Sequence, residues 1–205
     1  AQRGENLLLI ARREERLRSI SEDIQNKFNV KVLYFVADLT AQEAPNSIYQ
    51  YCKEHDLDVS TLVLNAGYQI NTRLHEASIE DEESCLRVLG LSVIMQTKLH
   101  LTDFVKRGGG KIMVVSSIAA FAPTSKEFAV LYGPVKTFMN RFVEGINGAY
   151  NKDNIFATSV CPGFTTTEFH EMSGTQERMD KVPSFMKMTA DDVAKEGIAG
   201  MDKNK

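Results

Sequence analysis

The stretch KIMVVSS, residues 111–117, determines the fold class. Its first five residues are apolar at nearly every position, which is typical of a strand buried on both faces of a parallel sheet. Further runs of strand length lie at 7–11, 30–36, 61–64 and 155–160. Segments of helical pattern alternate with them at 13–28, 41–55, 79–105, 131–150 and 189–198. This alternation predicts a doubly wound α/β fold, with a parallel sheet and helices on both of its faces.

Two of the expected helices have clear start signals. Ser78 and Thr189 each precede a helical segment, and each is followed within three residues by acidic side chains. Such residues cap a helix N-terminus and favour its dipole, so we expect helices to begin directly after both. The polar, Met-rich stretch 172–188 has no such pattern and is predicted to be a long loop or a short helical lid.

Composition narrows the function classes. The 205 residues fit one domain, and the net charge of −3 provides no basic field for nucleic acid. Three widely spaced cysteines, an odd number, argue against a disulfide framework and a zinc site. We see no signal peptide and no run of about 18 apolar residues that would predict a membrane span. We therefore expect a soluble, cytoplasmic protein without a metal.

Polar, small or charged residues follow every expected strand. In a doubly wound sheet, ligands bind beyond the carboxyl ends of the strands, so these residues are candidates for a binding site. They are ARR at 11–13, ADLT at 37–40, NAGY at 65–68, the serines at 116–117, and CPGFTTTEF at 161–169. The structural alternative is that they are ordinary turn residues.

Tyr132 and Lys136 are four positions apart at the start of the expected helix 131–150. Residues at this interval share one helix face, so the ammonium can lie near the phenol. A nearby cation favours phenolate, and we therefore expect Lys136 to lower the pKa of Tyr132 and make it a better proton exchanger. Pro134 is compatible because it falls in the first helical turn. Alone, such a pair is equally common as surface decoration.

Six segments in this order resemble the short-chain dehydrogenase/reductase family: ARREERL, ADLT, LNAG, VVSSIAAF, YGPVK and CPGFTTTEF. The resemblance covers about residues 1–200, and it implies a single Rossmann-type domain over residues 1–205. It also implies an oxidoreductase that interconverts a carbonyl and an alcohol by hydride transfer. The alternative function is a non-catalytic dinucleotide-binding or scaffold protein on the same fold.

The resemblance assigns catalytic roles to three side chains. Tyr132 is implied as the acid or base, Ser117 as the hydroxyl that binds the substrate oxygen, and Lys136 as the cation that tunes Tyr132 and binds the nicotinamide ribose. The interval from Ser117 to Tyr132 is slightly longer than in the family, and the extra residues fall in the expected loop APTSKEF, residues 122–128. The alternative is that Ser116 or Ser117 only ends the strand.

Cofactor contacts are implied at several strand ends. Besides Tyr132 and Lys136, the residues that match the family pattern are Asp38, Leu39, Asn65, Ala66, Gly67, Pro162, Gly163 and Thr167. Arg12 follows the first strand, where an arginine can pair with a 2′-phosphate, and Ala11 before it offers no carboxylate for a ribose. We therefore expect NADP(H) rather than NAD(H). The alternative is that Arg12 is a solvated residue at a helix start.

Two departures from the family pattern stand out. The glycine-rich G-x-x-x-G-x-G turn is absent, and with it the first strand; a last strand is also missing. We therefore expect the domain to be incomplete at both ends and the 205 residues to belong to a longer protein. In addition, Leu89 stands where many members have an Asn that holds a water in a proton relay to the lysine. The relay could use Ser92 instead, be dispensable, or be lost in a slow enzyme.

The substrate is the least readable feature. The methionines of 172–188 indicate an adaptable apolar cover over the substrate cleft, and hence a lipophilic ketone, aldehyde or alcohol. An exposed amphipathic helix would have a similar sequence. Pairing of long helices in the family implies a homodimer or homotetramer, and the apolar stretch 86–101 is compatible with this.

Overall fold

The computed structural model describes residues 1–123 and 130–204, and the chain forms two compact units, Ala1–Leu57 and Asp58–Lys205. The elements of the first unit are β1 (Leu7–Ala11), α1 (Glu14–Phe28), β2 (Val32–Val36) and α2 (Ala44–Glu54). The two strands are parallel, and Ala11 pairs with Val36. Their carboxyl ends therefore lie at the same edge of this sheet.

The second unit contains a parallel sheet with the strand order β3-β4-β5 and a small parallel pair, β6-β7. Its strands are β3 (Thr61–Leu64), β4 (Gly110–Val115), β5 (Ile155–Val160), β6 (Phe164–Thr166) and β7 (Lys187–Thr189). Its helices are α3 (Ile79–Leu86), α4 (Ser92–Arg107), α5 (Tyr132–Tyr150), α6 (Phe169–Met172), α7 (Gln176–Lys181) and α8 (Ala190–Asp202). A π-helical turn lies at Arg87–Leu91, and 3₁₀ turns lie at Ile118–Ala120, Asn151–Asp153 and Ser184–Met186.

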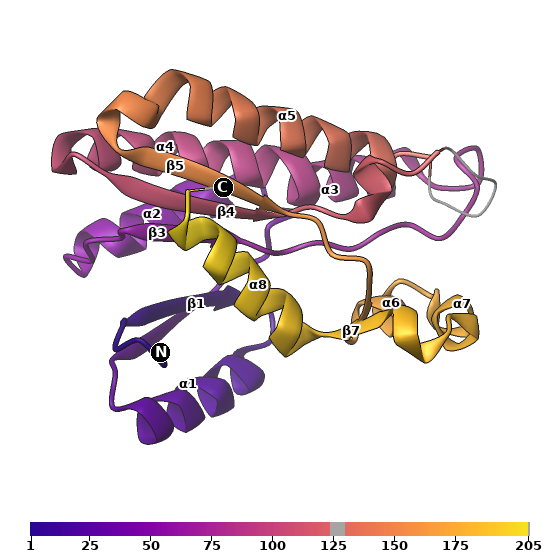
Figure 1. Ribbon diagram of the computed structural model, residues 1–205, viewed down its shortest axis with the longest axis horizontal. Helices are drawn as coiled ribbons and strands as arrows, with labels where there is room; N and C mark the ends of the chain where they lie inside the picture. Colours follow the sequence, from indigo (N-terminus) through magenta and orange to yellow (C-terminus); the bar gives the residue numbers. More distant parts are fainter. Residues whose placement is uncertain (124–129, 205) are drawn as a thin grey trace. The chain divides into compact units, whose positions relative to one another are not determined.

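Strand β4 is buried on both faces, as its unbroken apolar sequence predicts. Ile112 and Val114 belong to a core cluster with residues of α4 and α5. Met113 points the other way, and its sulfur lies 3.6 Å from where a Cβ on Gly197 of α8 would stand. Figure 1 shows the same arrangement, with α4 and α5 on one side of β4 and β5 and α8 on the other. The predicted α/β fold with parallel strands and helices on both faces is confirmed.

Two local features differ from the sequence expectation. The helix expected over 79–105 is divided by the π-helical turn at Arg87–Leu91, which contains a glycine. The stretch 172–188, expected to be a loop or short lid, contains α7 and most of β7, and β7 pairs with β6. Within the described residues, no helix is both long and apolar enough to cross a membrane.

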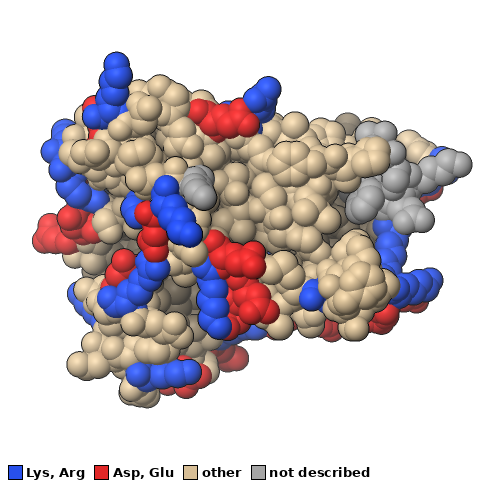
Figure 2. Space-filling model, in the orientation of Figure 1, with Lys and Arg blue, Asp and Glu red and all other residues tan. Residues whose placement is uncertain are grey.

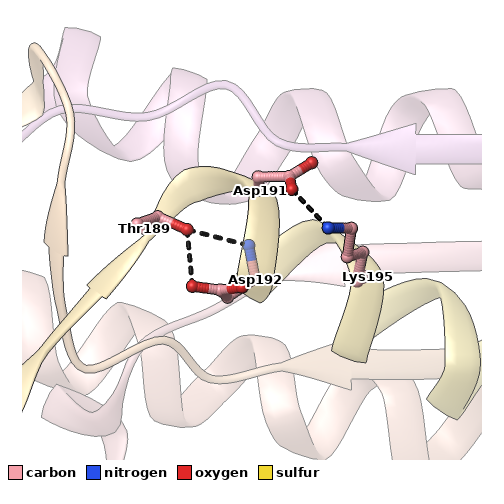
Figure 3. A network of polar contacts seen from close by, with 4 residues as sticks. All are labelled: Thr189, Asp191, Asp192 and Lys195. Carbon is pink, nitrogen blue, oxygen red and sulfur yellow. Dashed lines mark hydrogen bonds and ion pairs between the residues drawn. The ribbon is translucent and has the colours of Figure 1, made fainter.

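Both predicted helix caps are present. Ser78 Oγ accepts a hydrogen bond from the backbone N–H of Asp81 at 3.0 Å, and Thr189 Oγ1 accepts from that of Asp192 at 3.1 Å. Figure 3 shows that Thr189 also donates to the Asp192 carboxylate, at 2.6 Å, while Asp191 pairs with Lys195 one turn along α8. In each cap the side-chain oxygen thus satisfies one backbone N–H that the helix start leaves unpaired.

We expect Thr189→Ala to lower the free energy of unfolding by about 1 kcal/mol, because the first turn of α8 loses its acceptor. Urea unfolding of the variant and the parent protein measures the difference. Thr189→Ser is the matched control, since it keeps the hydroxyl and should retain most of the stability. An equal loss in both variants would show that the methyl group, rather than the cap, stabilises this region.

Candidate active site

Tyr132 is the first residue of α5, and Lys136 lies one turn further on the same helix face. Lys136 is 5 % exposed, and its Nζ lies 5.5 Å from the centroid of the Tyr132 ring. The ammonium donates a hydrogen bond to the carbonyl oxygen of Val115 at 2.8 Å. The helix start and the end of β4 thus hold the two side chains together.

The two serines after β4 have different partners, because successive residues in extended backbone point to opposite sides. Ser117 forms a hydrogen bond with Tyr132, and its Oγ accepts another from the backbone N–H of Ala119 at 3.1 Å. Ser116 is buried and donates to the carbonyl oxygen of Lys136 at 3.1 Å. Ser117 is therefore the serine beside the phenol, and Ser116 fastens α5 to the sheet.

A close contact between the 3₁₀ turn and α5 brings Ser117 to Tyr132. Thr137 donates a hydrogen bond to the carbonyl oxygen of Ala120 at 2.9 Å. A Cβ on Gly133 would stand 3.2 Å from the carbonyl oxygen of Ala119, so glycine allows the turn to lie directly on the helix. Most of the predicted APTSKEF loop lies outside the described residues. The longer interval in sequence therefore does not separate the two hydroxyl groups in space.

The expected lowering of the Tyr132 pKa is wrong for this structure. Burial disfavours phenolate and raises the pKa of Tyr132 to about 12; the hydrogen bond with Ser117 opposes this, and Cys85 adds to it. The sequence shows that Lys136 can reach Tyr132, but it does not show how little water surrounds the phenol. The Lys136 ammonium lies over the ring of Tyr132, but burial also disfavours this ammonium and lowers its own pKa.

Burial lowers the pKa of Lys136 to about 8, against the opposing influence of Cys161 and Cys85. An ammonium in this place has lost most of its hydration, and a single backbone carbonyl only partly replaces it. The proton on Lys136 is consequently held much less tightly than on an ordinary lysine, so this side chain can exchange protons close to neutral pH.

This lowered pKa predicts a pH dependence of stability. Unfolding restores the pKa of Lys136 from about 8 to its ordinary 10.5, so the unfolded chain binds more protons between these pH values. The stabilising contribution is complete above pH 10.5 and is lost as the pH falls through 8. Relative to Lys136→Met, we expect the wild type to gain about 3 kcal/mol in free energy of unfolding across this range, measured by urea unfolding. If the free energies of unfolding of the two proteins changed in parallel with pH, the lowered pKa of Lys136 would be contradicted.

Leu89 packs beside the lysine. It is 1 % exposed, and a Cβ on Gly67 would stand 2.9 Å from its Cδ2 and 3.9 Å from Lys136 Nζ. Ser92, the alternative relay group, is buried and donates to the carbonyl oxygen of Val88 in its own helix at 2.7 Å. The hydroxyl proton of Ser92 is therefore already used in a hydrogen bond with a backbone carbonyl, and this geometry does not favour a relay through Ser92.

The expected cofactor residues of the second unit, apart from Thr167, follow strands whose carboxyl ends lie at one edge of its sheet, because β3, β4 and β5 are parallel. Asn65, Ala66 and Gly67 are exposed directly after β3. Pro162 and Gly163 follow β5, and the carbonyl oxygen of Pro162 accepts a hydrogen bond from the residue after Ser117 at 3.0 Å. Thr167 is exposed after β6, and its Oγ1 accepts from the backbone N–H of Phe169 at 3.2 Å. Of these residues, Pro162 thus lies beside the turn that carries Ser117.

In the first unit, Arg12 and Asp38 follow the neighbouring carboxyl ends of β1 and β2. Both are exposed, and Leu39 beside them is partly buried. The backbone N–H of Thr40 donates to Asp38 and lowers the pKa of its carboxyl; the Thr40 hydroxyl and the Arg12 charge add to this. A guanidinium and a fixed carboxylate therefore stand at the same sheet edge.

Several residues around Tyr132 were not foreseen from the sequence. The ring of Phe169 lies 6.1 Å from the Tyr132 ring, between centroids. A buried cluster beneath the site, Cys85, Leu89 and Val135, packs against Tyr68, Ile70, Leu131 and Tyr132. Phe169 ends the segment CPGFTTTEF, so its closeness to the strand end was a usable signal. The others sit in a loop and in helices, where periodicity does not indicate which side chains meet.

Comparison with known sequences supports the same assignment. The sequence model described as short chain dehydrogenase matches residues 1–178. The very-long-chain 3-oxoacyl-CoA reductase of Rattus norvegicus is 28% identical over 174 residues, which cover 82% of this chain and 54% of that protein. An uncharacterized oxidoreductase of Staphylococcus saprophyticus is 25% identical over 167 residues, or 82% of this chain and 70% of that protein. The chain thus spans about half the length of the 3-oxoacyl-CoA reductases it matches.

Solved structures share the fold over nearly the whole chain. The short-chain dehydrogenase from Sphingobium yanoikuyae in complex with NADPH has a TM-score of 0.91 at 24% identity and covers 100% of this chain and 77% of its own. The L-sorbose reductase from Gluconobacter frateurii, complexed with NADPH and L-sorbose, has a TM-score of 0.84 at 22% identity, with coverages of 98% and 81%. Since the sequence model matches well over half of the residues, this chain belongs to the short-chain dehydrogenase/reductase family.

Proposed function

We propose that this chain is part of an NADP(H)-dependent oxidoreductase that interconverts a carbonyl and an alcohol. The observation that carries the proposal is the convergence of Ser117, Tyr132 and Lys136 at the end of β4. Lys136 is 5 % exposed and Tyr132 and Ser117 are partly buried, whereas a tyrosine and a lysine that only decorate the surface would both be exposed. Family membership and the similarity to named reductases support the same reaction class.

In each unit, the exposed groups at the strand ends have the chemistry of dinucleotide contacts. Asn65, Ala66 and Gly67 are small and accessible, which allows a ligand to approach the backbone closely. Asp38 has a fixed carboxylate that can accept from an adenine amino group, and Arg12 can pair with a 2′-phosphate. Pro162, Gly163 and Thr167 would hold the carboxamide end, and Lys136 the ribose. NADP(H) bound there would supply or accept the hydride.

The protein groups carry the proton chemistry. Because burial raises the pKa of Tyr132 to about 12, the phenol stays protonated at neutral pH and can donate to the oxygen of a carbonyl substrate. Ser117, oriented by its bonds with Tyr132 and Ala119, donates to or accepts from the same oxygen. When Tyr132 gives up its proton, the protonated Lys136 one turn away lowers the cost of the phenolate.

The surroundings of Tyr132 favour a lipophilic substrate. Phe169 lies beside the Tyr132 ring, and the side chains that pack with Tyr132 on the same buried cluster are aromatic or aliphatic: Tyr68, Ile70 and Leu131. In the view of Figure 2, the surface over the right-hand part of α5 carries few charged side chains, whereas charges of both signs gather elsewhere on this face. The named 3-oxoacyl-CoA reductases make a 3-oxoacyl thioester a reasonable first candidate. We still predict, from the sequence alone, that the protein is cytoplasmic and that it forms a homodimer or homotetramer.

Titration of the full-length protein with NADPH and NADH, followed by fluorescence, tests the proposal. We expect tight binding of NADPH and weaker binding of NADH, and then NADPH oxidation with some member of a panel of ketones, aldehydes and 3-oxoacyl thioesters. Preference for NADH would overturn the role of Arg12 and keep the reaction class. Binding without turnover of any carbonyl would favour a non-catalytic dinucleotide-binding protein, and no binding at all would reject the cofactor site.

A further inference from the structure

The ring of Phe169 lies beside that of Tyr132, and no part of the proposed reaction uses it. Phe169 opens α6, and its ring centroid lies 6.1 Å from that of Tyr132 at an interplanar angle of 47°. The side chain is only partly buried, so part of the ring remains accessible. A tilted ring pair at this distance makes a favourable contact.

The Phe169 ring is held by its neighbours in the same turn. His170 meets it edge to face, with centroids 5.5 Å apart and planes at 88°. His170 Nδ1 lies 3.1 Å from the Oγ1 of Thr175, and the backbone N–H of Thr175 donates to the carbonyl oxygen of His170 at 2.7 Å. Thr175 is 5 % exposed, so this short loop closes on a buried polar residue. The Phe169 ring therefore lies on a turn that these contacts hold in place.

Two hydrogen bonds attach the same turn to the loop that follows β3. The backbone N–H of Gln69 donates to Ser173 Oγ at 3.5 Å, and Asn71 Nδ2 donates to the carbonyl oxygen of Gly174 at 2.8 Å. The loop after β3 contributes Tyr68 and Ile70 to the cluster of Cys85, Leu89 and Val135 against which Tyr132 also packs. The turn that carries Phe169 is thus joined to a loop that shares the buried neighbours of Tyr132.

We propose that Phe169 is a specificity-determining residue, whose ring forms the wall of the substrate site beside Tyr132 and contacts an apolar substituent on the carbonyl carbon. The inference rests on the proposed function, since it needs a carbonyl oxygen at Tyr132 and Ser117. A substrate oriented by those hydroxyls must place one of its two substituents toward the surrounding side chains, and Phe169 presents an accessible apolar surface there. Large apolar substituents gain from this contact, and small ones do not.

Steady-state reduction of 4-phenylbutan-2-one and butan-2-one by the full-length protein with NADPH tests the inference. For Phe169→Ala, we expect kcat/KM for the phenyl-bearing ketone to fall about 10-fold or more, mainly through KM, and that for butan-2-one to stay within about threefold. Phe169→Leu should recover part of the loss because it restores apolar contact. Phe138→Ala removes a 51 % exposed phenylalanine from α5 and is the matched control, with no expected change in the ratio.

The outcomes separate this inference from the proposed function. An equal loss of kcat with both ketones would mean that Phe169 only supports Tyr132, and it would overturn a role in specificity. The same ratio in the wild type and in both Phe169 variants would also overturn it. A wild type that binds NADPH but reduces neither ketone rejects this substrate class while the cofactor site stands. Absence of NADPH binding would reject the proposed function itself.

Discussion

Replacing Tyr132 with phenylalanine should lower kcat for NADPH-dependent carbonyl reduction by about 10²- to 10⁴-fold, the range contributed by a positioned acid or base. The change removes only the hydroxyl, which is the group that meets Ser117, and keeps the ring that contacts Phe169 and Lys136. The fold and the strand-end groups are unaffected, so the dissociation constant of NADPH should change little. Steady-state kinetics and a cofactor titration on the same preparation measure both quantities.

Tyr150→Phe is the matched control, since Tyr150 ends the same helix and packs against the core away from the reacting groups. It should leave kcat within about twofold of the wild type, as expected for a substitution outside the reacting groups. Ser117→Ala should reduce kcat less than Tyr132→Phe, because Tyr132 can still donate its proton while the oxygen is less well held. Unchanged activity in Tyr132→Phe would reject the assigned mechanism and leave dinucleotide binding as the function.

Strand positions could be read from the sequence because strands in the interior of a parallel sheet are mainly apolar. The bounds of β1, β3 and β5 coincide with the runs 7–11, 61–64 and 155–160. The pair β6-β7 was not predicted, because each strand has only three residues and neither is continuously apolar. The propensity of so short a segment is weak, and a tertiary contact decides its conformation.

The long helix before β4 shows a different limit. Its start at Ser78 was predictable from the cap, but the π-helical turn at Arg87–Leu91 was not. An apolar pattern over five residues does not distinguish a π turn from an α turn, because both bury one face. The turn contains Leu89, which packs against Gly67 and beside Lys136, so the irregularity lies next to the site.

The sequence predicts which residues form the site, but it does not predict the direction in which their pKa values shift. Spacing alone places Tyr132 and Lys136 on one helix face, and the strand ends place the other groups at the sheet edge. The direction of the Tyr132 pKa depends on how much water the fold excludes, which involves Tyr68, Phe169 and other residues distant in sequence. Similarly, strand-end position does not distinguish Ser117 from Ser116; the family resemblance implies Ser117, and the hydrogen bonds of the structure separate the two serines physically.

Replacing Arg12 with glutamate should reverse the cofactor preference. We expect the ratio of kcat/KM for NADPH to that for NADH to fall by about 10²- to 10³-fold, because a 2′-phosphate loses a charge-assisted bond and meets a carboxylate instead. The substitution is at an exposed position after β1, so stability should be nearly unchanged. The measurement is steady-state kinetics with each cofactor at a fixed, saturating carbonyl.

Arg16→Glu is the matched control, because it makes the same change of charge on the exposed side of α1. If long-range charge alone set the preference, both variants would shift the ratio equally, and salt would reduce the shift in both. If Arg12 binds the phosphate directly, only Arg12→Glu reverses the ratio, and NADH can gain from a carboxylate that accepts from its ribose hydroxyls. An unchanged ratio in Arg12→Glu would make Arg12 a solvated residue at the helix start, and the preference for NADPH would then have to come from another group.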